Sequence, residues 1–317
     1  MEYLRSAASA VLAKSTGPLP NYTVGAPFDI HHRSSSIIWQ IHHGTKRDDG
    51  SSCTILIFDS ASDPNDKAKL IIAKNAARKL RTLRHPDVLK LLDSAETPTA
   101  VYIAVEPIRQ LQPVLDNWTR NGGTPEGKLE WIAWGLSRIA NALRFINVDA
   151  GAVHGNVRPE AIFLSQAGEW RLAGFELLTA KADLEGVIWN LGGIVPDASL
   201  YSSPEVKQDG WRVLRDHDSH VLDSYSFALL AFSAYNNLTP SSNITFAPPQ
   251  GSIPSALYTL LCRMLTPNPK NRLSVARLVE TANADGALWK DNRLARLSAD
   301  FENFLLASER ERNESIR

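Results

Sequence analysis

One stretch of the sequence decides the fold: Val153-His154-Gly155-Asn156-Val157-Arg158-Pro159-Glu160-Ala161-Ile162-Phe163-Leu164. It lies near the middle of the chain, where the character of the sequence changes. On its N-terminal side, residues 22 to 107 carry mostly strand signals, and from Leu129 onward the apolar residues follow a helical period. A sheet-rich lobe followed by a larger helical lobe predicts an α+β fold, and the cleft between two such lobes is the expected ligand site.

The sheet-rich part predicts a hairpin, a helix and two further strands. The hairpin strands, Ile37–Ile41 and Cys53–Phe58, flank a polar turn from Lys46 to Ser52. A helix is expected from Ala68 to Leu83. The two further strands are expected at Val88–Leu92 and Ala100–Glu106.

The helical part begins with a helix that buries one face. That face contains Trp131, Trp134, Ile139, Leu143 and Ile146, at spacings of three to five residues. Later helices are expected near Asp223–Tyr235, Ile253–Leu265 and Ser274–Ala284. A short helix is also expected at residues 3–14, and its small, alanine-rich face leaves two alternatives open: packing onto the main domain, or lying on a membrane surface.

The bulk composition excludes several classes of protein. With 317 residues and 44% hydrophobic content, the chain is long enough to bury a large core. Lys plus Arg (34) equals Asp plus Glu (34), so the net charge does not indicate a strongly nucleic-acid-binding surface. Cys53 and Cys262 match no metal-ligand spacing and are expected to be buried, small hydrophobic side chains in a reducing compartment. No apolar run is long enough to span a membrane, and the start lacks the features of a secretory signal.

The deciding stretch resembles the catalytic loop of protein kinases and the strand that follows it. Four more segments resemble, in the same order as in kinases, the metal-binding Asp-Phe-Gly segment, the end of the activation segment, the start of the central helix and the late arginine motif. They are Trp170–Glu176, Tyr201–Glu205, Asp223–Phe227 and Met264–Leu273. No single motif is specific, but five in order are strong support. The resemblance implies a bilobal protein-kinase-like fold.

The resemblance also places unsuitable residues where a kinase handles the phosphates. Leu56 falls at the position of the lysine that holds the α- and β-phosphates, and Ala76 falls at that of its glutamate partner. The segment expected to form the glycine-rich loop, Ile30–Ile38, contains no glycine. Its side chains would obstruct the close approach of the backbone that phosphate binding requires.

The positions that carry the reaction are changed as well. Asn156 stands in place of the catalytic aspartate and has no basic carboxylate to take the hydroxyl proton. Ala161 and Gly174 replace the two magnesium ligands, and neither offers a hard oxygen donor. Arg33 could reach a phosphate and Glu176 could offer a carboxylate, but several such rescues would have to act together. We therefore expect a pseudokinase with no catalytic residue, no bound cofactor and no metal site.

Residues that brace the kinase fold are retained. By analogy with kinases, Glu205 and Arg272 are expected to form a buried ion pair, and losing one partner of such a pair is costly. Asp223 is expected to hold the backbone of the catalytic loop through hydrogen bonds. His154 is expected to shape that loop rather than to perform chemistry.

The activation segment is not expected to be switched by phosphorylation. Gly155 replaces the arginine with which kinases read a phosphorylated activation loop. The apolar stretch Val187–Val195 leaves two alternatives open: a packed, fixed form, or an exposed patch for a partner.

The pattern is similar to that of the Scy-like pseudokinases, also called N-terminal-kinase-like proteins, from about Phe28 to the last residues. Its more specific parts are Ala76–Pro86, Ala167–Leu172 and Trp289–Phe304. In that family the last of these leads into an array of HEAT repeats. The resemblance implies four parts: an N-terminal extension (1–20), a kinase-like N-lobe (21–107), a kinase-like C-lobe (108–285) and the start of a helical HEAT-type region (286–317).

The resemblance to a fungal-type member of this family implies a scaffold or adaptor in COPI-dependent Golgi-to-ER traffic, in tRNA export from the nucleus, or in both. The implied partners are proteins of the COPI coat or of the small-GTPase and trafficking machinery, and also tRNA-export factors or tRNA through regions outside these residues. The implied location is cytoplasmic, at the periphery of the Golgi and COPI vesicles, with peripheral membrane association open, or at the cytoplasmic face of the nuclear pore. Two other classes stay open: a nucleotide-binding or weakly active protein kinase, and direct RNA binding.

Overall fold

The computed structural model describes residues 17–28, 37–60, 66–237, 248–284, 289, 292–294 and 297. The helix expected at residues 3–14, most of the segment expected to form the glycine-rich loop, and most of the helical region expected at 286–317 lie outside the described residues. Within the described ranges, none of the helices combines the length and the apolar composition that crossing a membrane requires.

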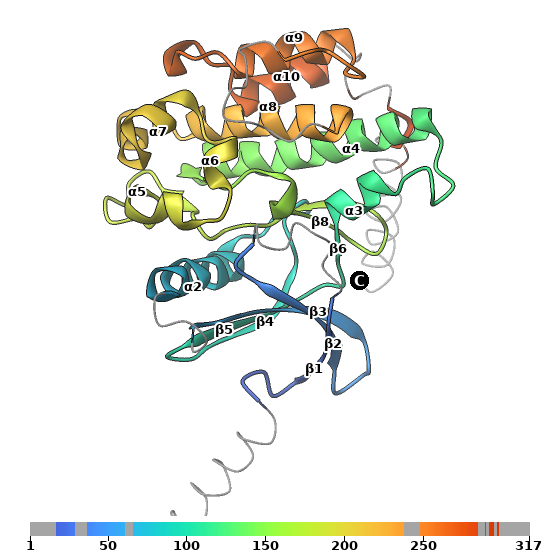
Figure 1. Cartoon of the computed structure of the whole chain (residues 1–317), viewed down its shortest axis with the longest axis vertical. Helices are drawn as coiled ribbons and strands as arrows, with labels where there is room; N and C mark the ends of the chain where they lie inside the picture. The colour runs from blue at the N-terminus through green and yellow to red at the C-terminus, as the bar shows by residue number, and fades with distance from the viewer. Residues whose placement is uncertain are drawn as a thin grey trace, which may run out of the picture.

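An antiparallel sheet of five strands and one helix form the first part of the molecule, which we call the N-lobe (Figure 1). The order across the sheet is β1 (Tyr22–Pro27), β2 (Gln40–Lys46), β3 (Ser52–Asp59), β5 (Ala100–Val105) and β4 (Leu91–Glu96), and α2 (Lys67–Thr82) packs on the sheet. In the central strand, Leu56 lies opposite Ile41 of β2 and Ile103 of β5. The predicted hairpin and helix are confirmed, although β2 begins at Gln40 rather than at Ile37.

The strand predicted at Val88–Leu92 is wrong in position, because β4 covers Leu91–Glu96. The residues before β4 pair with the other lobe instead. The amide of Leu89 donates to the carbonyl of Leu172 (2.9 Å), and the amide of Leu172 donates to the carbonyl of Asp87 (2.8 Å). An apolar run of this length fits a strand of the sheet or a bridge between lobes equally well, so periodicity does not separate the two.

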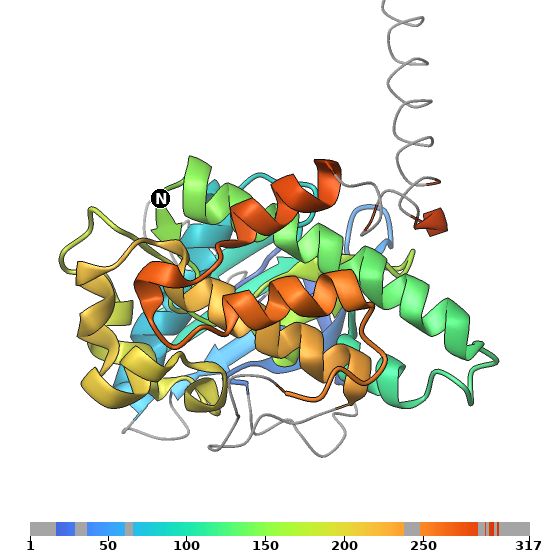
Figure 2. The same cartoon turned by 90° about the horizontal axis from the view of Figure 1, so that it is seen from above.

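The second part, which we call the C-lobe, is built around a helix that is buried on all sides. Every residue of α8 (His220–Asn236) from Val221 to Tyr235 is buried, as expected of a core helix. The α4 helix packs on α8, and α9 and α10 lie on the outer side of these two (Figures 1 and 2). The helices predicted here are confirmed as α4 (Pro125–Arg144), α8, α9 (Ser255–Met264) and α10 (Val275–Ala284).

Shorter elements complete the C-lobe, and some of them form the rim that faces the N-lobe (Figure 1). They are β6 (Arg109–Gln110), α3 (Leu111–Asp116), β7 (Ala152–Val153), β8 (Ile162–Leu164), β9 (Trp170–Leu172), β10 (Thr179–Ala180), α5 (Ile188–Leu191), α6 (Ala198–Tyr201), α7 (Pro204–Asp209) and the 3-10 helix η7 (Trp211–Asp216). Because β8 and β9 pair as a hairpin and β7 pairs with β10, the deciding stretch Val153–Leu164 runs between two small sheets at this rim.

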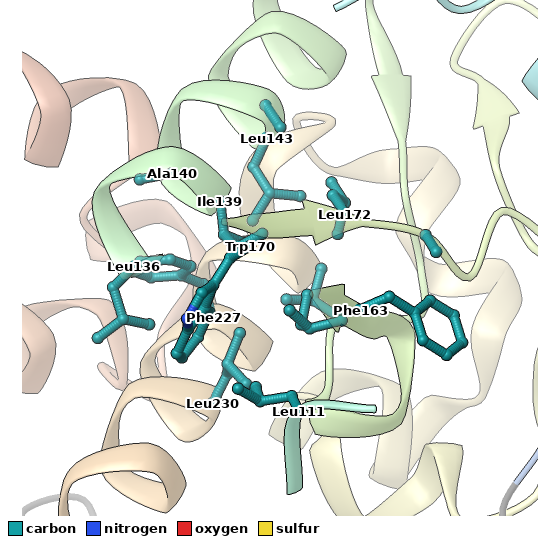
Figure 3. Packing of buried hydrophobic residues seen from close by; sticks show 14 of the residues in the cluster. Leu111, Leu136, Ile139, Ala140, Leu143, Phe163, Trp170, Leu172, Phe227 and Leu230 are labelled. Atoms are coloured by element: carbon teal, nitrogen blue, oxygen red, sulfur yellow. The ribbon is translucent and has the colours of Figure 1, made fainter. Parts of the chain in front are cut away.

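Trp170 of β9 anchors the core of the C-lobe. Figure 3 shows its indole among Leu136 of α4 and Phe227 of α8. Gly135 of α4 makes this possible, because a Cβ atom there would lie 2.2 Å from the Trp170 ring. A complete aromatic ring buried in this way contributes several kcal/mol, on the order of 3–5 for truncation to alanine.

An ion-pair chain crosses the junction between the lobes. Arg138 of α4 pairs with Asp87 (Nε to Oδ1, 2.7 Å) and with Glu169 (Nη2 to Oε1, 3.6 Å). Glu169 also pairs with Arg171, whose Nε lies 3.4 Å from Oε1 of Glu106. Asp87 and Glu106 belong to the N-lobe side and the other three residues to the C-lobe, so this chain of alternating charges ties the lobes together.

Candidate functional site

The cleft between the lobes is nearly full where the positions that differ from the kinase pattern lie. The cavity there has a volume of about 30 Å³, and a larger hollow of about 530 Å³ adjoins it at Ile37 and Glu160. Sites for small organic ligands occupy roughly 300–1,000 Å³, whereas a water molecule needs roughly 10–15 Å³. The cavity is lined by Ile37, Ile38, Trp39, Leu56, Ala76, Leu80, Leu89, Ile103, Asn156, Arg158, Glu160, Ala161, Phe163, Ala173, Gly174, Phe175, Glu176 and Val195. Five of the positions that differ from the kinase pattern, Leu56, Ala76, Asn156, Ala161 and Gly174, therefore meet at one place.

On the N-lobe side, the cleft wall is apolar at the two positions where kinases place an ion pair. Leu56 and Ala76 are both buried and belong to the main hydrophobic core. The helix α2 is instead fastened by the neighbouring residue, Asn75. Its Nδ2 lies 3.0 Å from the carbonyl oxygen of Glu176, 3.1 Å from that of Leu178 and 3.3 Å from that of Phe175. Hydrogen bonds from the Asn75 amide to backbone carbonyls thus link α2 to the C-lobe, beside the positions where Leu56 and Ala76 stand in place of a lysine–glutamate pair.

Polar side chains bridge the mouth of the cleft. The indole Nε1 of Trp39 donates to Oε1 of Glu176 at 2.5 Å, and the amide Nδ2 of Asn156 donates to Oε2 of the same carboxylate at 2.9 Å. Asn156 Nδ2 also lies 3.2 Å from the carbonyl of Gly174. All three bridging side chains are at least nine-tenths buried. We call Trp39, Glu176 and Asn156 the cleft bridge.

The buried charge of Arg158 completes this network. Its Nε donates to Oδ1 of Asn156 (2.7 Å) and its Nη1 donates to the carbonyl of Pro196 (2.6 Å). Burial lowers the pKa of Arg158, and the carboxylates of Glu160 and Glu176 oppose that effect. Two opposite charges, on Arg158 and Glu176, therefore share one desolvated region through the amide of Asn156.

The two positions expected to have lost magnesium ligands pack against each other. Gly174 has a left-handed backbone (φ +77°), and a Cβ atom there would lie 2.6 Å from the Cβ of Ala161 and 2.9 Å from Nδ2 of Asn156. An aspartate at position 174 would need its neighbours to move. Among the described residues, no group of three or more His, Cys, Asp or Glu side chains is placed to hold a metal ion.

Asp223 holds the loop that leads to Asn156. Its carboxylate accepts from the backbone amides of His154 (2.8 Å) and Gly155 (2.9 Å) and from the side-chain amide of Asn147 (2.7 Å). Burial raises the pKa of Asp223 to about 6, even though these hydrogen bonds act in the opposite direction.

His154 is a neutral, fully satisfied core histidine. Its Nε2 lies 2.9 Å from the carbonyl of Ala173, and its Nδ1 accepts from the amide of Asn156 (3.2 Å). Burial lowers the pKa of His154 to about 4. Its ring also meets that of Phe175 edge to face, with centroids 5.1 Å apart. The histidine thereby connects the loop to the segment that carries Gly174.

Glu205 and Arg272 form a buried, two-pronged ion pair, with Nη1–Oε1 2.7 Å and Nη2–Oε2 2.8 Å. Burial alone would raise the pKa of Glu205, but the hydrogen bonds from Arg272 and Ser203 and the charge of Arg272 hold it below its ordinary value. Arg272 also donates to the carbonyl of Val221 at the start of α8 (2.9 Å). The pair therefore fastens α7 to the central helix.

The activation segment takes the packed form of the two alternatives. Ile188, Trp189 and Val195 are buried in a second hydrophobic cluster. Gly155 contributes to this packing: with φ +79°, its position would put a Cβ atom 2.6 Å from Cδ1 of Ile188. A larger residue at position 155 would strain the left-handed backbone and require the Ile188 side chain to shift.

Several residues of the site carry no signal in the sequence. No motif singles out Trp39 or Asn75, because their partners lie more than 90 residues away along the chain. Glu176, a candidate substitute for a lost metal ligand, has both oxygens engaged by Trp39 and Asn156. Arg33 lies outside the described residues. Of the two cysteines, Cys53 is buried as expected, whereas Cys262 is partly exposed.

The sheet-bearing N-lobe, the helical C-lobe and the cleft where the kinase motifs meet define the class: this is a bilobal protein-kinase-like domain. The chain belongs to the Scy1-like family of kinase-like proteins. The probable inactive serine/threonine-protein kinase scy1 of Dictyostelium discoideum is 31% identical over 246 residues, 77% of this chain and 28% of the relative. That relative is named as inactive, which supports a pseudokinase-like domain here.

Two further relatives agree in class. The protein kinase domain-containing protein ppk3 of Schizosaccharomyces pombe is 26% identical over 297 residues, 92% of this chain and 41% of the relative. The human SCY1-like protein 2 is 27% identical over 199 residues, 57% of this chain and 21% of the relative. The chain thus spans less than half the length of each of these relatives. No protein-family model matches it.

Proposed function

We propose that this domain is a non-catalytic interaction module, and that the protein acts as a scaffold or adaptor in intracellular transport. The cleft bridge is the observation that carries the proposal. Trp39, Glu176 and Asn156 connect the lobes across the space where a kinase places the phosphates and their metal ions. The ligand of an active kinase is here replaced by side chains of the protein itself.

Charge supports the same conclusion. Phosphoryl transfer depends on cations that neutralise the phosphates and on a base that accepts the hydroxyl proton. In this cleft, Leu56 and Ala76 are apolar, and Asn156 is an amide whose Nδ2 donates to Glu176 and to the carbonyl of Gly174. Among the described residues that line this cleft, the one cation is Arg158, and it already donates to Asn156 and to the carbonyl of Pro196. Among the described residues of the cleft, a triphosphate would face the Glu176 carboxylate without a free cation beside it.

The transport role rests on the family resemblance. We propose that the partners are proteins of the COPI coat or of the associated trafficking machinery, with tRNA-export factors or tRNA bound by other regions. We further propose a cytoplasmic location, at the Golgi or COPI-vesicle periphery or at the cytoplasmic face of the nuclear pore. Co-purification of the full-length protein with coat subunits, lost when the kinase-like domain is deleted, is the expected result. Unchanged co-purification would assign coat binding to other regions.

Nucleotide binding is the test of the central claim. A ligand that binds only the folded state raises the free energy of unfolding, by about 2.7 kcal/mol at a ligand concentration one hundred times its Kd. The melting temperature rises as a consequence. We expect no shift of the melting temperature with millimolar ATP and magnesium. A clear shift would favour the alternative of a nucleotide-binding domain. Transfer of phosphate from ATP to a peptide, abolished by Asn156→Ala, would establish a weakly active kinase and overturn the proposal.

A further inference from the structure

The exposed side of α2 carries a row of cations without acidic neighbours on the helix. Among its 16 residues are six lysines and arginines and no aspartate or glutamate. The excess of positive charge on α2 is a local feature, because the whole chain has a formal net charge of zero. The buried side of the same helix consists of Ile72, Ala73, Ala76, Ala77 and Leu80. Figure 1 shows α2 at the margin of the N-lobe, beside the sheet.

The row has the spacing of a helix–helix seam. Lys67, Ile71, Lys74, Arg78 and Arg81 follow one another at intervals of 4, 3, 4 and 3 residues. At 3.6 residues per turn, these positions fall within about 80° of the helix circumference and extend over about 21 Å. Intervals that average 3.5 residues keep a row of side chains facing one partner helix. We call these five residues the α2 seam.

Two lysines of the seam are available to a partner. Within the described residues, Lys67 and Lys74 form no ion pair or side-chain hydrogen bond. Between them lies Ile71, which is 52% exposed and is one of six large hydrophobic side chains exposed to solvent in the described part of the chain. An apolar contact flanked by two free cations is a small but chemically specific surface.

The other end of the seam already binds a carboxylate. Arg78 Nη2 lies 3.1 Å from Oε2 of Glu96, and Arg81 Nη1 lies 3.5 Å from Oε1 of the same residue. The Glu96 carboxylate from β4 therefore flanks the row. A membrane surface or a nucleic acid presents a broad field of negative charge, and this carboxylate would face it at the edge of the contact. A partner only one helix wide avoids that repulsion.

From this geometry we infer that the α2 seam is a docking surface for an acidic α-helix of a partner protein. The partner helix would carry Asp or Glu at alternating intervals of three and four residues, with one apolar side chain opposite Ile71. Complementary charges along such a seam set the partner and the register. The inference names partner chemistry for the interaction role proposed above and rests on it.

A designed peptide tests the inference. The probe is a fluorescent, helix-forming 20-residue peptide with Glu at the seam positions and one central Leu, and its scrambled isomer has the same composition. We expect the folded domain to bind the designed peptide more tightly than the isomer, and binding to weaken as salt rises. Lys67→Glu with Lys74→Glu should weaken binding by roughly tenfold or more, since two attractive contacts become repulsive.

The controls separate the seam from charge in general. Arg263→Glu with Lys270→Glu makes the same charge change at exposed C-lobe positions and should leave the affinity unchanged. A peptide with Lys in place of Glu should bind the Lys67→Glu/Lys74→Glu protein better than the wild type. The inference is overturned if the isomer binds equally well, if both double variants lose affinity equally, or if phosphatidylserine vesicles or a homopolymeric RNA compete for Lys67 and Lys74 more strongly than the peptide. These results would leave the nucleotide test of the proposed function unaffected.

Discussion

At the scale of single residues, the cleft residues that differ from those of kinases also pack against and hydrogen-bond to one another. Gly174 needs its small size because Ala161 and Asn156 occupy the space around it. Asn156 donates to the Glu176 carboxylate, which an aspartate could not do. Restoring one kinase residue at a time therefore meets neighbours that are adapted to its absence.

Gly174→Asp illustrates this cost. The left-handed backbone alone disfavours a side chain by about 1–2 kcal/mol, and crowding against Ala161 adds about 1–3 kcal/mol. Gly122→Asp is the matched control, because Gly122 has a similar φ of +82° but a Cβ atom added there would have no neighbour within 4 Å. Urea unfolding should show a larger loss of stability for Gly174→Asp. Equal losses in the two variants would mean that the cleft has room for the restored aspartate.

His154 gives the fold a pH-dependent component. Its pKa is about 4 in the folded protein and 6.5 when unperturbed, so the unfolded chain takes up the proton first. Its contribution is complete above pH 6.5 and is lost as the pH falls toward 4. Asp223 acts in the opposite sense, since its raised pKa of about 6 makes the folded state take up a proton first below that pH. The two effects partly cancel in the wild type.

Replacing His154 by Phe should separate them. The variant loses the hydrogen bonds to Ala173 and Asn156 and should be less stable at pH 7. Between pH 7 and pH 5 the difference from the wild type should narrow by about 2 kcal/mol, because the variant no longer has to keep an imidazole neutral. Urea unfolding at both pH values measures this. A difference that stays constant would show that His154 titrates normally in the folded protein.

At the scale of elements, the sequence predicts what depends on local periodicity. Helices α4 and α8 and the β2–β3 hairpin follow from apolar spacing and turn residues, which act over short distances. The position of β4 does not, because Leu89 could pair within the sheet or with Leu172. The cleft bridge cannot be predicted from local sequence at all, because Trp39 and Glu176 are 137 residues apart and come together only when the two lobes assemble.

Trp39→Phe tests whether the cleft bridge stabilises the contact between the N-lobe, at the residue before β2, and Glu176 of the C-lobe. The change keeps most of the ring packing but leaves Oε1 of buried Glu176 without its donor, at a cost of about 1–3 kcal/mol. Trp134→Phe is the control, because the Trp134 indole donates no hydrogen bond within the described residues. Combining Trp39→Phe with Glu176→Gln should cost less than the sum of the two changes. Additive losses would mean that the two side chains do not act together.

At the scale of the whole molecule, three sets of side-chain contacts join the lobes, in addition to the backbone pairing of Leu89 with Leu172. The cleft bridge lies on one side, Asn75 fastens α2 to the segment from Phe175 to Leu178, and the ion-pair chain from Asp87 to Glu106 crosses the junction. In an enzyme that opens and closes around a nucleotide, such ties would slow each cycle. In a docking module they are an advantage, because a preorganised surface loses less entropy on binding.

Replacing Arg138, a member of the ion-pair chain, should destabilise both lobes. Its side chain is 10% exposed and pairs with Asp87, which is 8% exposed, so Arg138→Met leaves a carboxylate buried without its cation. We expect a loss of about 3–5 kcal/mol, most of it regained when Asp87→Leu is added, since well-packed apolar side chains often replace a buried pair without loss. Arg277→Met is the control, because the side chains of the Arg277–Glu280 pair are 72% and 56% exposed and the pair should contribute almost nothing to stability.

Hydrogen exchange of the Arg138→Met variant should show weaker protection in β4 and β5 as well as in α4, because the ion-pair chain joins both lobes. Loosening confined to α4 would show that the chain is a feature of the C-lobe alone.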